Sequence, residues 1–201
     1  MMIGKSSRFE EISMRKVLPP AGLFTLGFVA LMLFRGPTAR AVPDQQEKGP
    51  PAAPEFTKDT EWLQSKPLTV AGLRGQVVVV HFWTFGCINC IHNYPAYNAW
   101  QEKFAGKGVT VVGIHSPETK GEADVKRVRA SAKKNGLKFA IAVDNSLQNW
   151  KNWNNRYWPT VYLIDKQGRV RYHWEGELNF GTTKGERLMR QRIEELLAEK
   201  E

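Results

Sequence analysis

Two cysteines separated by two residues are the part of this sequence best suited to redox chemistry. Cys87 and Cys90 are the only cysteines among the 201 residues, and they follow a valine-rich, aromatic run typical of a buried strand. If a helix begins at Cys87, its dipole and free N–H groups stabilise a thiolate there, and Cys90 lies one turn further on. A disulfide across so short a loop restrains the unfolded chain little. We therefore expect a reactive pair, with Cys90 the more buried partner.

Other uses of a cysteine pair match the sequence less well. Attachment of a c-type haem needs His directly after the second cysteine, whereas Ile91 stands there and His92 follows. No second ligand pair has zinc-finger spacing, so no metal site is predicted. A peroxidatic cysteine usually has Pro and Thr at fixed positions before it; Thr84 fits, but Val80 occupies the proline position. A peroxiredoxin-like peroxidase stays an alternative, as does a redox-inactive or copper-handling binding protein of the cell envelope.

The first 41 residues have the composition of an export signal. Four Lys/Arg side chains precede an uncharged, mostly apolar run over residues 17–34, which as a helix would span roughly 27 Å, close to the thickness of a bilayer core. We predict that residues 1–41 are a signal peptide or N-terminal membrane anchor, with membrane contact only through residues 17–34 if uncleaved. The rest of the chain is then extracytoplasmic, in the periplasm or cell envelope.

One folded domain is expected after this segment. Residues 42–58 contain four prolines and little apolar periodicity, which predicts a linker, and residues 59–201 are enough for one core. With 42% hydrophobic and 24% charged residues, the composition excludes a collagen, a coiled-coil rod or a multi-span membrane protein. An apolar stripe runs through the basic stretch 126–138, so we predict a solvated helix face and no nucleic-acid partner.

Apolar patterns predict strands alternating with helices. Strands are expected over residues 76–83, 109–115, 139–143, 160–165 and 170–174. Helices are expected over residues 87–107, 121–135, 147–153 and 183–199. Pro95 should break the first helix, and the last should turn inward Leu188, Ile193, Leu196 and Leu197. The order predicts an α/β fold, a mixed central sheet with helices on both faces.

The residues around the cysteines resemble a known family. The run Phe82–Cys90 (FWTFGCINC), with Pro95 and the downstream Trp158-Pro159-Thr160, is similar to thioredoxin-fold proteins. More narrowly, it resembles the exported thiol–disulfide oxidoreductases of the TlpA/ResA type and the thioredoxin-like domain of DipZ-type proteins. The resemblance covers roughly residues 60–200.

The resemblance implies a thioredoxin fold and a disulfide reductase that acts on protein disulfides through Cys87 and Cys90. It implies no cofactor beyond this redox-active disulfide, protein thiol or disulfide clients as partners, and a membrane thiol carrier as electron donor. It also implies a cis Trp158–Pro159 bond facing the sulfurs. The client-binding residues that it suggests are Trp83, Trp158, Pro159 and Thr160.

His81 departs from the family pattern. The residue two before Trp83 is an acid in many relatives, where it is thought to relay a proton to the second cysteine. His81 could do so as a neutral base, or it could be a buried core histidine, and both interpretations stay open. Three further side chains are expected near the site: His92, His115 and Glu118.

Overall fold

The computed structural model describes residues 49–200. The predicted signal or anchor at residues 1–41 lies outside them, as does the first part of the predicted linker. Within the described range, no helix has both the length and the apolar character needed to cross a bilayer.

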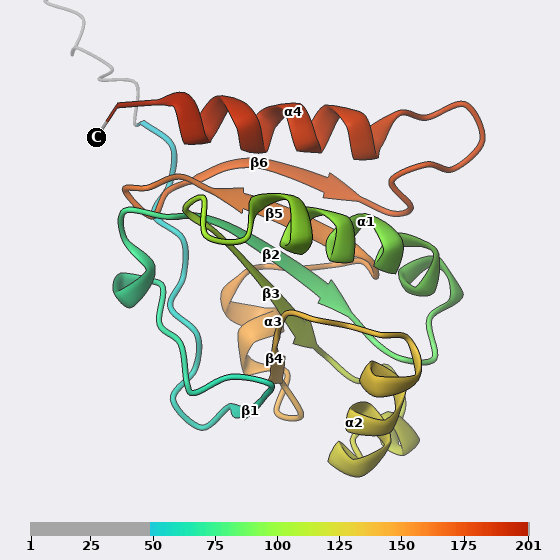
Figure 1. Cartoon of the computed structure of the whole chain (residues 1–201). Coiled ribbons are helices and arrows are strands. Elements are labelled where there is room, and N and C mark those ends of the chain that lie inside the picture. The colour runs from blue at the N-terminus through green and yellow to red at the C-terminus, as the bar shows by residue number, and fades with distance from the viewer. Residues whose placement is uncertain (1–48, 201) are drawn as a thin grey trace, which may run out of the picture. The chain divides into compact units, whose positions relative to one another are not determined.

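Six strands form one mixed sheet in the order β1-β4-β3-β2-β5-β6 (Figure 1). The strands are β1 (Glu61–Leu63), β2 (Val77–Trp83), β3 (Val109–His115), β4 (Ala140–Val143), β5 (Thr160–Ile164) and β6 (Val170–Glu175). β3 pairs in parallel with β2 and β4, and the other neighbours are antiparallel. The sequence did not predict β1, because three residues are too few to show an alternating pattern.

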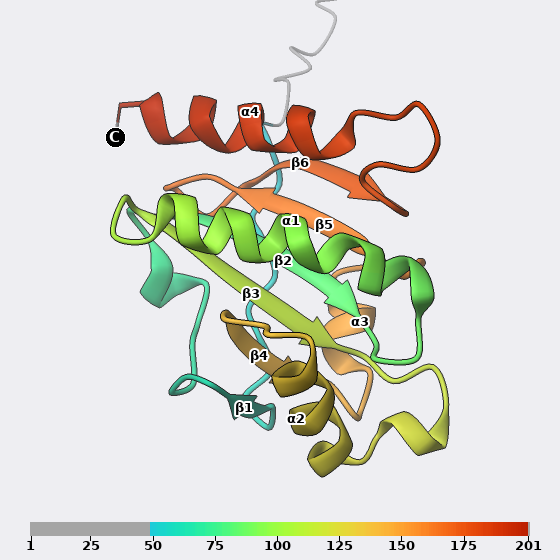
Figure 2. The same ribbon diagram turned by 45° about the vertical axis from the view of Figure 1, so that its right-hand side comes forward.

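Helices cover both faces of this sheet, as predicted. They are α1 (Ile88–Phe104), α2 (Val125–Lys134), α3 (Gln148–Asn152) and α4 (Gly185–Ala198), with short 3-10 helices η1 (Ala71–Leu73) and η2 (Lys120–Glu122). α1, α2 and α4 lie on the same side of the sheet (Figure 2). Their buried residues share one core cluster, and those of η1 and the α3 region share another. All seven residues of β2 are buried because the strand supplies both clusters, alternating between the two faces.

Two details of the helices differ from the sequence-based expectation. α1 continues through Pro95 without a break, because its buried face packs on the sheet on both sides of that residue. In α4, Leu188 is 41% exposed, whereas Met189, Ile193 and Leu196 are at most 2% exposed. These three residues, spaced i, i+4 and i+7, form the stripe that faces the sheet, and Leu188 lies outside it.

The packed domain begins earlier than the predicted start at Asp59. Ala52 forms a bridge to the β5–β6 hairpin, and the Glu55 carboxylate accepts two backbone N–H groups at the start of η1. Phe56 is only 5% exposed and contacts the rings of Trp62 and Trp153. Part of the stretch 42–58 is therefore bound to the domain, which a proline-rich composition does not reveal, because the contacts are to residues far along the chain.

Candidate active site

Cys87 lies where β2 has ended and α1 begins. It is the N-cap residue of α1, in an extended conformation, and its Sγ accepts the backbone N–H of Cys90 at 3.2 Å. Both cysteines are free thiols. Cys87 is partly exposed and Cys90 is fully buried, as expected from a helix that starts at the first cysteine.

The surroundings move the pKa values of the two thiols in opposite directions. Hydrogen bonding with the Cys90 side chain, helped by the backbone N–H groups of Cys90 and Asn89, lowers the pKa of Cys87 from 9.0 to about 7 against the effect of burial. Burial, with the neighbouring Cys87 as a second cause, raises the pKa of Cys90 far above its ordinary value. Near neutral pH, Cys87 is therefore the more readily ionised and more accessible thiol, and Cys90 stays protonated and buried.

β5 brings the Trp158-Pro159-Thr160 segment beside the redox loop, defined as residues 84–87. Thr160 pairs with Phe82, which sets Pro159 and Trp158 opposite the residues that lead to Cys87. The Trp158–Pro159 peptide is cis, as the resemblance implies. Trp158 is half-buried, and the Thr160 hydroxyl donates to the carbonyl of Tyr157 at 2.9 Å. The pairing thus places Trp158 and Pro159 near the redox loop, with Trp158 half-buried and Pro159 buried, whereas the Thr160 hydroxyl turns back into its own loop.

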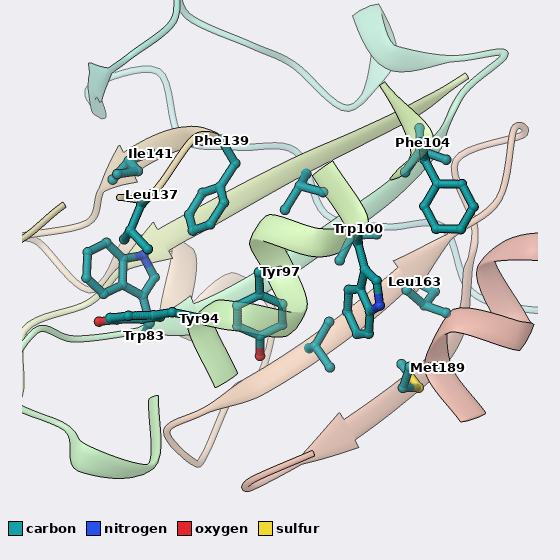
Figure 3. Close-up of a cluster of buried hydrophobic side chains, with 14 of the residues drawn as sticks. Trp83, Tyr94, Tyr97, Trp100, Phe104, Leu137, Phe139, Ile141, Leu163 and Met189 are labelled. Atoms are coloured by element: carbon teal, nitrogen blue, oxygen red, sulfur yellow. The ribbon is translucent and has the colours of Figure 1, made fainter. Parts of the chain in front are cut away.

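Trp83 is not placed to touch a client, contrary to the expectation from the sequence. Its side chain is 0% exposed and packs edge-on against the rings of Tyr94 at 5.5 Å and His115 at 4.9 Å. Figure 3 shows it in the cluster beside α1, together with Tyr97 and Phe139. The indole of Trp83 is therefore a core side chain at the end of β2 that precedes the redox loop.

His81 lies in the same core. Its ring stacks on Tyr97 at 3.9 Å and meets Phe139 edge-on at 4.7 Å, and burial lowers its pKa to about 3. Neither ring nitrogen has a hydrogen-bond partner among residues 49–200, so no direct bond joins it to Cys90. A Cβ on Gly113 would lie within 2.9 Å of both His81 Nε2 and Trp83 Nε1, so the two nitrogens border the same space.

The histidines expected near the site have different surroundings. His115 is buried, which lowers its pKa to about 4, and its Nε2 lies 3.4 Å from the hydroxyl of Thr84. Thr84, the residue that fits a peroxidase motif, therefore directs its hydroxyl at His115. His92 lies on an exposed face of α1, with its Nδ1 3.0 Å from a carboxylate oxygen of Glu177.

The sequence did not predict Glu122, a buried carboxylate that contacts the redox loop. One oxygen accepts the N–H groups of Glu118 and Thr119 at 2.7 and 3.1 Å, and the other lies against Gly86 so closely that a Cβ there would clash with it. Thr119 and Glu122 form a capping box on η2. The spacing Thr-x-x-Glu, which is typical of a capping box, could have predicted this contact from the sequence. Glu118, the neighbour that the sequence did suggest, has an exposed side chain.

No metal centre is evident in the part of the chain that the structure describes. Among residues 49–200, no three His, Cys, Asp or Glu side chains are grouped closely enough to hold an ion. The chemistry that this arrangement can perform is that of two unequal thiols.

Comparison with known proteins gives related sequences. A family model described as the AhpC/TSA family matches residues 51–173. Protein DipZ of Mycobacterium tuberculosis is 39% identical over 142 residues, which are 69% of this chain and 20% of DipZ, so the chain spans about a fifth of that relative's length. Thiol-disulfide oxidoreductase ResA of Bacillus thuringiensis is 29% identical over 155 residues, covering 77% of this chain and 84% of ResA.

Solved structures share the fold. The solution structure of a thioredoxin-like protein in its oxidised form superimposes with a TM-score of 0.65 and 26% sequence identity, covering 76% of this chain and 98% of that one. This similarity and the mixed six-stranded sheet confirm the predicted thioredoxin-type α/β fold.

Proposed function

The chain belongs to the AhpC/TSA family, and from this premise we propose that it is a thiol–disulfide oxidoreductase that reduces protein disulfides outside the cytoplasm. The observation that carries the proposal is the inequality of the two thiols. Cys87 is partly exposed, has a pKa of about 7 and accepts the N–H of Cys90, whereas Cys90 is buried with a raised pKa. The similarity to ResA, which is named a thiol-disulfide oxidoreductase, supports the same reaction class.

The reaction consists of two exchange steps. The Cys87 thiolate attacks one sulfur of a client disulfide, forming a mixed disulfide and releasing the other client sulfur as a thiolate, which takes a proton from water. Cys90 then loses its proton and attacks Cys87 Sγ. The Cys87–Cys90 disulfide forms, the second client thiol leaves, and two electrons have passed from the protein to the client.

The client is proposed to lie along Trp158 and Pro159. Their position follows from the pairing of Thr160 with Phe82, which sets them beside the redox loop. Because Trp158 is half-buried, part of its side chain is open to a partner.

The oxidised domain needs a source of two electrons for the next turnover. We assign this to a membrane thiol carrier, because the basic, apolar N-terminal segment has the composition of an export signal or anchor. The proposed location is therefore the periplasm or cell envelope. No bound cofactor takes part in the proposed chemistry.

His81 is proposed to receive the proton of Cys90 through an intervening water. A buried polar side chain without protein partners is costly unless it has a water or a function. Its pKa of about 3 keeps the ring neutral and free to accept a hydrogen bond at pH 7, but it also makes the ring a weak base, so a proton received there must pass on at once.

Reduction of insulin disulfides by the reduced protein tests the proposed function. We expect the wild type to reduce insulin and the Cys87→Ser variant to be inactive. A reduction potential near the ~−270 mV of thioredoxin would fit a reductase, and one near the ~−120 mV of DsbA would make the protein an oxidant. Hydroperoxide consumption or stoichiometric copper binding, without insulin reduction, would instead support the peroxidase or the copper-handling alternative.

A further inference from the structure

A buried carboxylate behind the client site connects two separate segments. Asp144 directly follows β4 and is 1% exposed. One of its oxygens accepts the backbone N–H of Asn149 at 3.0 Å, and the other accepts the N–H of Trp150 at 2.8 Å and the hydroxyl of Ser116 at 3.1 Å. Asp144 therefore caps the start of α3 and fixes it to the residue that follows β3.

Two indoles close this set of contacts into a ring. The indole of Trp150 stacks on that of Trp158, with ring centroids 4.0 Å apart and planes 29° apart. Trp158 Nε1 donates to the carbonyl oxygen of Ser116 at 3.0 Å. Asp144, Trp150, Trp158 and Ser116 thus each contact the next, and together they set both the position and the orientation of Trp158. We call these four residues the Trp158 ring.

The Trp158 ring lies next to the cysteines. The N–H of Ser116 donates to the carbonyl of Trp83 at 3.0 Å, and the N–H of Cys87 donates to the carbonyl of Thr84, the next residue, at 3.3 Å. Trp158 also packs against the core cluster that contains Cys90. A change in the orientation of this indole would therefore alter the surface to which a client disulfide must bind.

The contacts of Trp158 decide what it can recognise. One face of the indole is covered by Trp150, and its only N–H is bonded to Ser116. Its exposed remainder can offer an apolar aromatic surface and no hydrogen-bond donor. Because the other three residues of the Trp158 ring hold the indole in place before binding, little binding free energy is lost in ordering it when a client binds.

We propose that Trp150, Asp144 and Ser116 are positioning residues that hold Trp158 as a preformed apolar wall, so that the protein prefers disulfides with a large apolar side chain next to the attacked cysteine. This inference rests on the proposed function and adds a substrate preference to it. Partial burial of such a side chain against the indole should change affinity by about tenfold.

Single-turnover reduction of three short peptides tests the preference. Each peptide has one intramolecular disulfide, and they differ only in the residue before the first cysteine, which is Leu, Gly or Lys. The limiting rate and the half-saturating peptide concentration are measured with pre-reduced protein. For the wild type we expect a half-saturating concentration about tenfold lower for the Leu peptide than for the Gly peptide, at similar limiting rates.

Variants of Trp150 separate positioning from simple stability. In Trp150→Leu the advantage of the Leu peptide should fall to about twofold or less, with an unchanged limiting rate, whereas Trp150→Phe keeps a stacked ring and most of the preference. The matched control is Trp62→Leu, which removes another half-buried indole, on β1, and should leave the preference intact. Reduction of glutathione disulfide, which carries no such neighbour, should be the same in the wild type and Trp62→Leu.

Circular dichroism gives a readout that does not depend on activity. Two indoles stacked at 4.0 Å should produce an exciton couplet, which Trp150→Leu and Trp158→Leu remove and Trp62→Leu retains. Absence of the couplet from the wild type would show that Trp150 does not stack on Trp158. Equal half-saturation for the three peptides, or preference for the Lys peptide, would overturn the apolar wall while the proposed function stands. A wild type that reduces none of the peptides would overturn the proposed function itself.

Discussion

The backbone N–H of Cys90 donates to Sγ of Cys87 at 3.2 Å, so the second cysteine of the pair stabilises the thiolate of the first. The same helical turn that makes this bond buries the Cys90 side chain completely. One element, the start of α1, therefore makes the two thiols unequal in exposure and in pKa.

The reactivity of Cys87 should follow its lowered pKa. With a pKa of about 7 rather than 9.0, about half of the thiol is ionised at pH 7, compared with about one in a hundred for an ordinary thiol. The rate of alkylation by iodoacetamide, followed by peptide mass spectrometry, should rise with pH to a plateau with its midpoint near 7. Cys90 should react slowly throughout, also in Cys87→Ser. A midpoint near 9 for Cys87 would contradict the hydrogen bonding at the helix start.

His81 should affect resolution of the mixed disulfide but not its formation. His81→Asn keeps polarity and some volume but cannot accept a proton, so we expect resolution by Cys90 to slow severalfold. His81→Asp restores the residue type of many relatives and should recover the rate. Stopped-flow mixing with a client disulfide separates the two steps, at a temperature where every variant is folded. If the wild type and His81→Asn resolve the mixed disulfide at the same rate, His81 is a packing residue only.

The contact between Gly86 and Glu122 should be visible as an energetic coupling. A Cβ at Gly86 would displace the carboxylate that accepts two backbone N–H groups after β3, so Gly86→Ala should cost about 1–3 kcal/mol in urea unfolding. In a Glu122→Ala background, which removes the clash, the same substitution should cost about 0.5 kcal/mol or less. Costs that simply add in the double variant would show that the two sites are independent.

Phe56 should contribute to the stability of the domain although it lies in the predicted linker. Phe56→Ala removes a ring that is 5% exposed and should lower the free energy of unfolding by about 3 kcal/mol. Phe180→Ala is the matched control, because that ring is 69% exposed and its loss should change the stability by about 0.5 kcal/mol or less. If the two substitutions cost the same, residues 51–56 do not belong to the packed domain.

The elements nearest the cysteines were the ones that the sequence predicted well. β2 and β3 are continuous apolar runs buried on both faces, and such runs are recognisable without tertiary information. The N-cap position of Cys87 followed from the same pattern. For Trp83 the prediction failed, because the strand is buried on both faces up to its last residue, and proximity in a motif does not show whether a side chain is exposed.

The supporting residues could not be predicted, since their contacts depend on how the chain folds back on itself. Ser116 and Asp144 bond over 28 positions of the chain, and the stacking of Trp150 on Trp158 depends on the path of the irregular segment between α3 and β5. Leu188 shows the same limit in a helix. The apolar residues of α4 are compatible with a buried stripe that includes either Leu188 or Met189, and packing on the sheet buries Met189.

Trapping of the mixed disulfide tests the central claim most directly. The account predicts that Cys90→Ser, pre-reduced and mixed with insulin, accumulates a covalent complex through Cys87, which non-reducing electrophoresis and mass spectrometry detect and dithiothreitol releases. Cys87→Ser should form no such complex, because the buried Cys90 is protonated and out of reach. A complex through Cys90 in Cys87→Ser, or none in Cys90→Ser, would contradict the assignment of Cys87 as the nucleophile and Cys90 as the resolving thiol.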